Sequence, residues 1–137
     1  MELKPMLYTV VLNVPANTPA SSPVKQDIAL ETGMLSKVSV LIPSGHAGLA
    51  HLVILYGETQ VIPREGDISG DDETLTFTEC FEIAAPSETL TLVGWNEDDT
   101  YSHEFVVRFE VLPLWLAAPA RYIVDLLEKI FRILRII

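Results

Sequence analysis

Two acidic segments contain the side chains of this chain that are best suited to bind a cation. The first holds Asp67, Asp71, Asp72 and Glu73, and the second covers residues 96–99. Calcium takes about six to eight oxygen ligands, and two loops at one end of a β-sandwich could supply them. However, the spacing matches no EF-hand loop, and charged turns are commonly just solvated. We therefore predict that no metal ion is bound, with calcium as the alternative.

The three histidines and the single cysteine form no zinc or catalytic motif. His46 falls in a predicted turn, His51 in an apolar strand and His103 at the start of the last strand, while Cys80 is far from all three in sequence. Simple alternation places Cys80 outward, unless a bulge near Glu79 shifts it. The sequence also lacks a G-x-S-x-G nucleophile motif and a glycine-rich phosphate loop. We expect hydrogen-bonded histidines, a structural thiol, no cofactor and no enzymatic activity.

Four aromatic residues could form a platform that stacks on a sugar ring. They are Tyr56, Phe77, Trp95 and Tyr101. Most of them fall on strand positions where packing in the core is the commoner use, and Tyr101, beside an acidic loop, is the one expected to be exposed. A carbohydrate-binding or adhesin-like module is therefore the alternative function, with a glycan as its ligand.

The C-terminal segment predicts an amphipathic helix. Pro119 suits a first helical turn because its missing N–H would have no partner there. Apolar residues then recur at spacings of four and three, and charged residues occupy the other positions. Six charges in the last 17 residues exclude a membrane span. The residues expected to form an oligomer interface are Ile123, Leu126, Leu127, Ile130, Phe131, Leu134 and Ile137.

This apolar stripe has three alternative uses. It could dock on its own sandwich, associate with copies of itself or another protein, or lie on a membrane surface. Association is favoured over the membrane surface and over docking, because the four-three spacing continues to Ile137, with no polar cap at the end.

The elements that must position these residues are strands. Apolar residues alternate in residues 6–14, 24–30, 34–42, 74–83, 89–95 and 103–112, which is the period of a half-buried β-strand. Residues 49–56 are apolar on both faces, as in a central strand, and residues 59–62 are a short further strand. Turns fall where Gly, Pro, Asn and Asp gather. Seven or eight strands of this length predict a mainly β, antiparallel, jelly-roll-like sandwich over residues 1–113, with the amphipathic helix in residues 114–137. Phe105, Val107, Phe109 and Val111 are predicted to share a core face.

Residues 13–23 contain Pro15, Pro19 and Pro23 among small polar residues. This segment is too rich in proline for a paired central strand, so we predict an extended crossover along the edge of the sandwich. A long first connection of this kind suits a Greek-key topology.

The charge is divided unevenly between these two parts. The whole chain has a net charge of −10. Residues 1–113 carry five Lys or Arg and 17 Asp or Glu, a net charge of −12, whereas residues 114–137 carry four and two, a net charge of +2. An acidic body repels a phosphate backbone, so we expect no nucleic-acid binding through it. No signal peptide is recognised at the N-terminus, and synthesis in a host cytoplasm is expected.

Several turn sequences resemble those of small jelly-roll structural proteins of tailed bacteriophages and related virus-like particles. These are residues 42–45 (Ile-Pro-Ser-Gly), 56–57, 60–63, 70–73 and 96–103. The resemblance is one of general layout and covers about residues 6–113, without the helix. It implies a virion component that is present in many copies, such as a capsid, decoration, vertex or tail protein.

Together these features predict a structural subunit of a viral or phage-type particle that forms a homo-oligomer. Its expected partners are copies of itself and other structural proteins. One rival is the carbohydrate-binding or adhesin-like module, and another is a cupin-type enzyme, which would need His and carboxylate groups converging inside the barrel.

Overall fold

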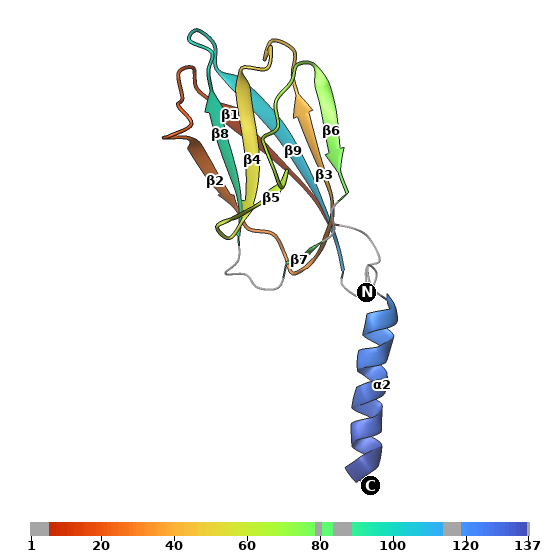
Figure 1. Cartoon of the computed structure of the whole chain (residues 1–137). Helices are drawn as coiled ribbons and strands as arrows, with labels where there is room; N and C mark the ends of the chain where they lie inside the picture. The colour runs from red at the N-terminus through yellow and green to blue at the C-terminus, as the bar shows by residue number, and fades with distance from the viewer. Residues whose placement is uncertain (1–5, 79–80, 84–88, 114–118, 137) are drawn as a thin grey trace.

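The computed structural model describes residues 6–78, 81–83, 89–113 and 119–136. They form two β-sheets that face each other and one helix (Figure 1). The strands are β1 (Met6–Val14), β2 (Val24–Ile28), β3 (Gly33–Ile42), β4 (Ala50–Tyr56), β5 (Thr59–Ile62), β6 (Glu73–Phe77), β7 (Phe81–Ile83), β8 (Leu90–Asn96) and β9 (His103–Leu112), and the helix is α2 (Pro119–Ile136). The predicted fold class, a mainly β antiparallel sandwich with a C-terminal helix, is confirmed.

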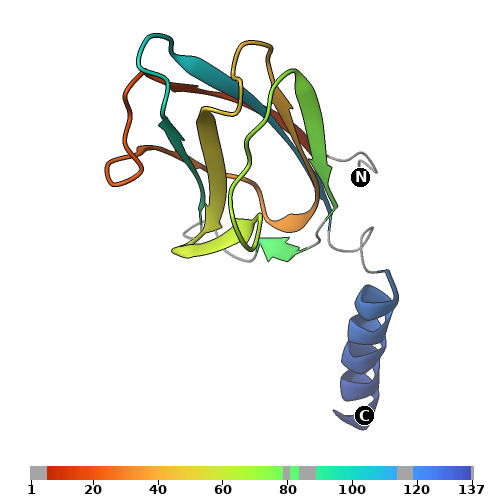
Figure 2. The same ribbon diagram turned by 45° about the horizontal axis from the view of Figure 1, so that its top comes forward.

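The strand order is that of a long hairpin rolled into two layers. One sheet has the order β1-β9-β3-β6, with β7 also paired to β3, and the other has the order β2-β8-β4-β5. Early strands pair with late ones in nested fashion: β1 with β9, β2 with β8, β3 with β6 and β7, and β4 with β5. Apart from the pairs β4–β5 and β6–β7, successive strands also lie in opposite sheets, as in a jelly roll. Figures 1 and 2 show the two layers from different sides.

The predicted strand at residues 74–83 is wrong in one respect, because the structure divides it into β6 and β7. Both pieces pair with β3, but in different registers. Phe77 lies opposite Val38, and Phe81 lies opposite Leu35, so three steps along β3 correspond to four steps on the other side. The sequence predicted a bulge near Glu79 as an option, and Glu79 and Cys80 themselves lie outside the described residues.

A second irregularity lies in β3. The pairing of β3 with β9 shifts between Leu35 and Lys37, so that Ser36 is an extra residue on the β3 side. The Ser36 hydroxyl donates a hydrogen bond to the carbonyl of Glu110 at 3.1 Å. β-Bulges of this kind increase the local twist of a strand. β3 therefore changes register with both of its neighbours over the same short stretch.

The core fills the space between the sheets. All four residues predicted to share a core face on β9 are buried, which confirms that prediction, and β3, β4 and β8 supply most of the remaining core. Gly94 on β8 also faces inward: a Cβ there would lie 2.8 Å from Val14 Cγ2 and 3.0 Å from Leu12 Cδ2. A larger side chain would thus push β8 away from β1. The buried apolar side chains of these four strands are Leu35, Val38, Val40, Ile42, Ala50, Leu52, Val53, Ile54, Leu90, Leu92, Val93, Phe105, Val107, Phe109 and Val111.

The crossover predicted in residues 13–23 joins β1 of one sheet to β2 of the other. It is held to the end of β8 by backbone hydrogen bonds, from the Asn96 amide to the Thr18 carbonyl at 2.9 Å and from the Asn17 amide to the Asp98 carbonyl at 2.8 Å. The Asn17 side chain adds a bond to the Asp99 carbonyl at 3.2 Å. This segment therefore closes the edge of the sandwich without forming a strand.

We expect the sandwich to fold without the helix. A chain ending at Pro113 keeps every described strand and the whole buried core, so it should show a β-type circular dichroism spectrum and a cooperative thermal melt. The full-length protein is the reference. A broad, non-cooperative melt after truncation would show that the core depends on residues beyond 113.

Candidate functional site

The helix α2 presents an uncovered apolar face. Every side chain from residue 123 to residue 135 is exposed, and in both ribbon views the helix lies beyond one end of the sandwich, clear of both sheets (Figures 1 and 2). Exposure of large apolar side chains at this level is costly in water. Eight of them are exposed to between 42% and 60%: Ile123, Val124, Leu126, Leu127, Ile130, Phe131, Ile133 and Leu134.

The described residues of the predicted interface all lie on this face. Six of the seven are among the eight exposed side chains, and the seventh, Ile137, lies outside the described residues. Val124 and Ile133 also belong to the face but were not among the predicted interface residues. Val124 stands seven residues before Phe131, and Ile133 stands seven residues after Leu126, so a strict heptad repeat would have found both.

Charged residues occupy the opposite side of α2. Asp125 stands four residues before Lys129, and Glu128 stands four residues before Arg132, the order that stabilises a helix best. Arg135 lies in the last turn, where a positive charge interacts favourably with the helix dipole. The helix thus has local reasons to form, and its apolar face remains available. Among the described residues, no helix is long and apolar enough to cross a membrane.

At the other end of the sandwich, two histidines are buried against each other. The rings of His46 and His103 have centroids 4.6 Å apart, and His46 also contacts the edge of Phe105 at 5.0 Å. His46 Nε2–H donates to the Glu104 carbonyl at 2.9 Å. Its Nδ1 is buried and has no hydrogen-bond partner in the described part of the chain. The predicted turn position is correct, but nothing in the sequence indicated that this turn packs into the core.

Asp98 organises the second acidic segment from the inside. Its carboxylate accepts a hydrogen bond from His103 Nε2 at 2.8 Å and bonds from the amides of Thr100 and Tyr101 at 2.9 and 3.2 Å. The Thr100 amide, followed by the His103 side chain, lowers the pKa of Asp98 below its ordinary value. A carboxylate with this many donors stabilises its loop and is not free to bind a cation.

Asp71 has a similar role in the first acidic segment. Its pKa is lowered by hydrogen bonds from the amides of Ala47 and Gly45, and the bond from Gly45 measures 2.8 Å. Asp71 thereby ties the turn that contains His46 to the loop before β6. In the described residues no three His, Cys, Asp or Glu side chains are grouped to hold a metal ion. The acidic loops therefore act as caps for backbone amides.

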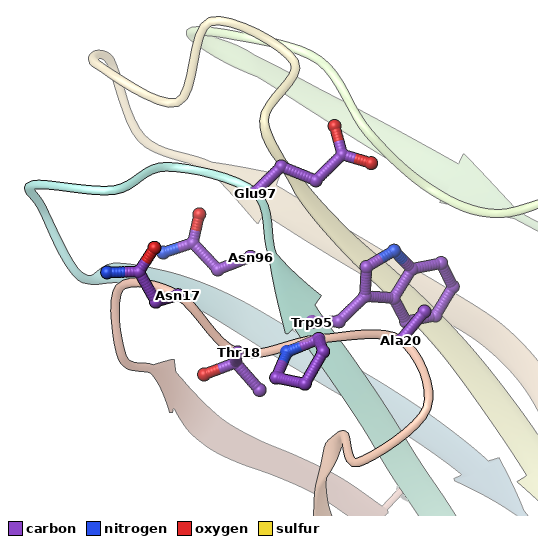
Figure 3. A pocket seen from close by; sticks show the side chains of 7 residues that line it. Asn17, Thr18, Ala20, Trp95, Asn96 and Glu97 are labelled. Atoms are coloured by element: carbon purple, nitrogen blue, oxygen red, sulfur yellow. The ribbon is translucent and has the colours of Figure 1, made fainter.

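Of the four aromatic residues considered for a sugar platform, Trp95 lines a pocket. The pocket has a volume of about 300 Å³ and lies between the crossover and the end of β8 (Figure 3). His51 stacks against Trp95 with ring centroids 5.3 Å apart, and His51 Nδ1 lies 2.9 Å from Asp67 Oδ1. The pocket is lined by Asn17, Thr18, Pro19, Ala20, Trp95, Asn96 and Glu97.

Three polar side chains around this pocket already donate hydrogen bonds within the protein. The Asn17 amide group donates to Asp99, the Thr18 hydroxyl donates to the Pro15 carbonyl at 2.7 Å, and the Asn96 amide group donates to Val14 and Tyr101. A sugar site needs a few convergent polar groups that are free to bind. The pocket is therefore better explained as the seat of the crossover.

Two of the other three aromatic side chains, Tyr56 and Phe77, lie apart from Trp95. Tyr56 and Trp95 are at opposite ends of the β4–β8 ladder, where Tyr56 faces Leu90 and Trp95 faces His51. Phe77 belongs to the other sheet. Tyr101 is 68% exposed, which confirms its predicted exposure. The structure thus does not assemble the four side chains into one platform.

No protein-family model matches the sequence, and no curated protein matches it. Solved structures of similar fold include the Yersinia pseudotuberculosis-derived mitogen, with 13% identity over 79% of this chain and 87% of that chain and a TM-score of 0.45. A Bacillus endospore appendage, from a family of disulfide-linked pili, has 11% identity over 82% and 92% and a TM-score of 0.37. A chain of the infectious bursal disease virus Gt strain has 13% identity over 80% and 32% and a TM-score of 0.35. Similarities this distant do not bear on function.

The buried histidine makes stability depend on pH. Burial lowers the pKa of His46 below its ordinary value of 6.5, because desolvation disfavours the charged ring. The unfolded chain then binds more protons than the folded one below about pH 6.5, so this contribution to stability is complete above that pH and decreases as the pH falls through the folded pKa. Asp98 and Asp71, with lowered pKa values, contribute stability above their ordinary value of 3.8 and lose it in more acidic solution.

We therefore expect the melting temperature to fall more between pH 7 and pH 5 in the parent than in a His46→Gln variant. Acid also reduces the repulsion within the negatively charged body, so the informative quantity is the difference between parent and variant. Scanning calorimetry at pH 8, 7, 6 and 5 measures it. Equal pH dependence in both proteins would contradict the assignment to His46.

We also expect stability to be independent of calcium. The carboxylates of Asp71 and Asp98 accept hydrogen bonds from the protein, so EDTA should leave the melting temperature unchanged within error. The reference is the same protein with added calcium chloride. A calcium-dependent rise of several degrees would instead make Asp71, Asp72 and Asp98 ligands.

Proposed function

We propose that this protein is a non-enzymatic structural subunit of a viral or phage-type particle, and that it forms a homo-oligomer through its C-terminal helices. The observation that supports this most is the uncovered apolar face of α2. Eight large apolar side chains lie between residues 123 and 134, and each keeps at least 42% of its surface exposed. Such a face requires a cover, and a second copy of the same helix is the simplest one.

The repeat of this face specifies how the helices would pack. Ile123, Leu127, Ile130 and Leu134 are spaced four, three and four residues apart, so Leu occupies the a positions of a heptad and Ile the d positions. That arrangement disfavours a two-stranded coiled coil and favours bundles of three or four helices. The seam alone thus indicates more than two copies.

The residues beside the seam support the same conclusion. Leu126 and Ile133 take the g positions, and Val124 and Phe131 take the e positions, which in dimeric coiled coils are commonly charged. A dimer would leave these four side chains at its solvent-facing margin. A bundle with more helices buries a wider face of each one, so it covers the e and g side chains as well.

Energy estimates are compatible with a stable bundle. Burial of a Leu or Ile side chain contributes roughly 1.5–3 kcal/mol, while association costs on the order of 4–15 kcal/mol in lost translational and rotational freedom. Four seam residues and four flanking ones per chain can exceed that cost. Residues 114–137 carry a net positive charge and the sandwich carries a net negative charge. The helical segments and the sandwiches therefore attract each other, whereas the sandwiches of different copies repel one another.

We expect the double change Leu127→Asp and Ile130→Asp to separate the helices, which lowers the mass of the oligomer, and to leave the sandwich folded. The carboxylates would have to be buried without partners at the centre of the bundle. Native mass spectrometry or sedimentation velocity reads the mass, and circular dichroism reads the fold. The matched control, Glu128→Gln with Arg132→Gln on the polar side, should keep the parent mass.

Three outcomes would count against this proposal. The parent could be monomeric, the seam variant could unfold the sandwich rather than lower the mass of a folded protein, or the parent could bind lipid vesicles through α2. The second result would assign the helix to its own core, and the third would assign it to a membrane surface. The carbohydrate-binding alternative depends on Trp95 and would be favoured by a glycan-array signal that Trp95→Ala removes.

A further inference from the structure

Within the described part of the chain, no strand pairs with the outer edge of β1. β1 pairs with β9 on one side and is the end strand of its sheet, with nine residues from Met6 to Val14. None of these residues is charged, and none is proline or glycine. Its ladder with β9 runs through all nine residues without a register shift. Such an edge offers a row of backbone N–H and C=O groups to another strand.

The other end strands have features that discourage pairing with a strand of another chain. β2 has five residues and contains Lys25 and Asp27, and β6 has five residues and begins with Glu73. β5 has four residues and is followed directly by Pro63. Charges, proline and shortness all discourage pairing between sheet edges. Among the end strands of the described sheets, β1 is thus the one built without these features.

Apolar side chains accompany this open edge on the outer face of the sheet. Leu7 is 74% exposed and Val11 is 50% exposed. Val11 lies opposite Val106 of β9, which in turn lies opposite Leu41 of β3, so an apolar row crosses the outer face and ends at β1. A neighbouring strand would extend this row and cover both exposed residues.

We propose that β1 pairs antiparallel with β1 of a second copy, about a two-fold axis that passes beside Thr9. In this register Thr9 faces Thr9 of the other copy, and Leu7 of each copy faces Val11 of the other. Threonine pairs and aliphatic pairs are among the favourable cross-strand neighbours. The two four-strand ladders then join into one continuous sheet, and the contact is the same patch on both copies.

A second copy fits this edge better than an unrelated strand because the sequence is complementary to itself. The outward-facing residues nearest the axis, Leu7, Thr9 and Val11, each meet another outward-facing apolar or hydroxyl side chain in this register. The like charges nearest the axis are those of Arg108 in the two copies, and Arg108 lies opposite Thr9 on β9. The two copies of Arg108 would be separated by three strand spacings, about 14 Å, which exceeds the screening length of about 8–10 Å at ordinary ionic strength.

Cysteine cross-linking of the full-length protein tests the register. In a Cys80→Ser background, Thr9→Cys should form an intermolecular disulfide under mild oxidation. Leu7→Cys alone should not, because its own copy would stand four residues away along the strand, about 13 Å. A mixture of Leu7→Cys and Val11→Cys should link again. The matched control is Gln26→Cys, an exposed residue of the protected edge strand β2.

Association is measured separately from the helix contact. In the Leu127→Asp, Ile130→Asp background, the protein should remain dimeric, and adding Leu7→Lys with Val11→Lys should weaken the dimer by at least about tenfold in Kd, because like charges then face each other twice. Gln26→Lys should leave the dimer unchanged. Analytical ultracentrifugation over a concentration series gives the Kd.

The proposal is overturned if Thr9→Cys links no more than Gln26→Cys, or if Leu7→Cys alone links as well as the mixture. A helix-seam variant that is monomeric at high concentration would also overturn it, since the expected partner of the β1 edge would then be a strand from a different protein. A dimeric parent whose Thr9→Cys variant links, and whose mass the helix-seam changes leave unaltered, would remove the helix bundle and leave the β1 contact standing.

Discussion

The pairing of β1 with β9 is the contact on which the rest of the fold depends. It joins Met6 to Val111 and Val14 to His103, so it encloses nearly all of the sandwich sequence. Every other early strand pairs with a partner inside that span. β9 is also the central link of its sheet, because it holds β1 on one side and β3 on the other. Because this pairing joins residues far apart in the sequence, it makes folding slow compared with that of proteins of similar stability whose contacts are local.

The same pairing sets the positions of the polar groups at the loop end. β9 begins at His103, whose ring contacts His46 and Asp98, and the turn that follows β8 is fixed by Asp98 and Asn96. Buried polar groups are stable only when their hydrogen bonds are supplied. Here the loops supply them to one another, and the crossover adds its own bonds to the same turn. The acidic composition of these loops thus serves backbone geometry.

Features set by residues close together in the sequence could be predicted, whereas features set by contacts between distant residues could not. Alternation placed Phe105, Val107, Phe109 and Val111 on one buried face, because side chains two residues apart in a strand point to the same face of the sheet. The helix stripe followed from the same kind of local period. The division of residues 74–83 did not, since it depends on a register change against β3, far away in sequence.

The buried histidine pair shows the same limit. His46 looked like a turn residue, and it is one, but its burial depends on packing against the start of β9 nearly sixty residues later. The role of Asp98 as an acceptor for three donors likewise requires the folded turn. Composition indicated a carboxylate-rich loop and could not distinguish a ligand set from an internal cap.

The two ends of the sandwich differ in chemistry, and the helix leaves from only one of them. β9 starts at the loop end with His103 and finishes at Leu112, on the side where α2 follows (Figure 1). Copies joined through parallel helices would therefore all point the same way, with the helices at the hub and the loops at the rim. That rim would display Tyr101 and the exposed carboxylates of Glu97 and Asp99 from every copy. Such an assembly, if formed as proposed, would convert a modest acidic patch on one chain into a ring of negative charge, which would repel other anionic surfaces and concentrate cationic ones.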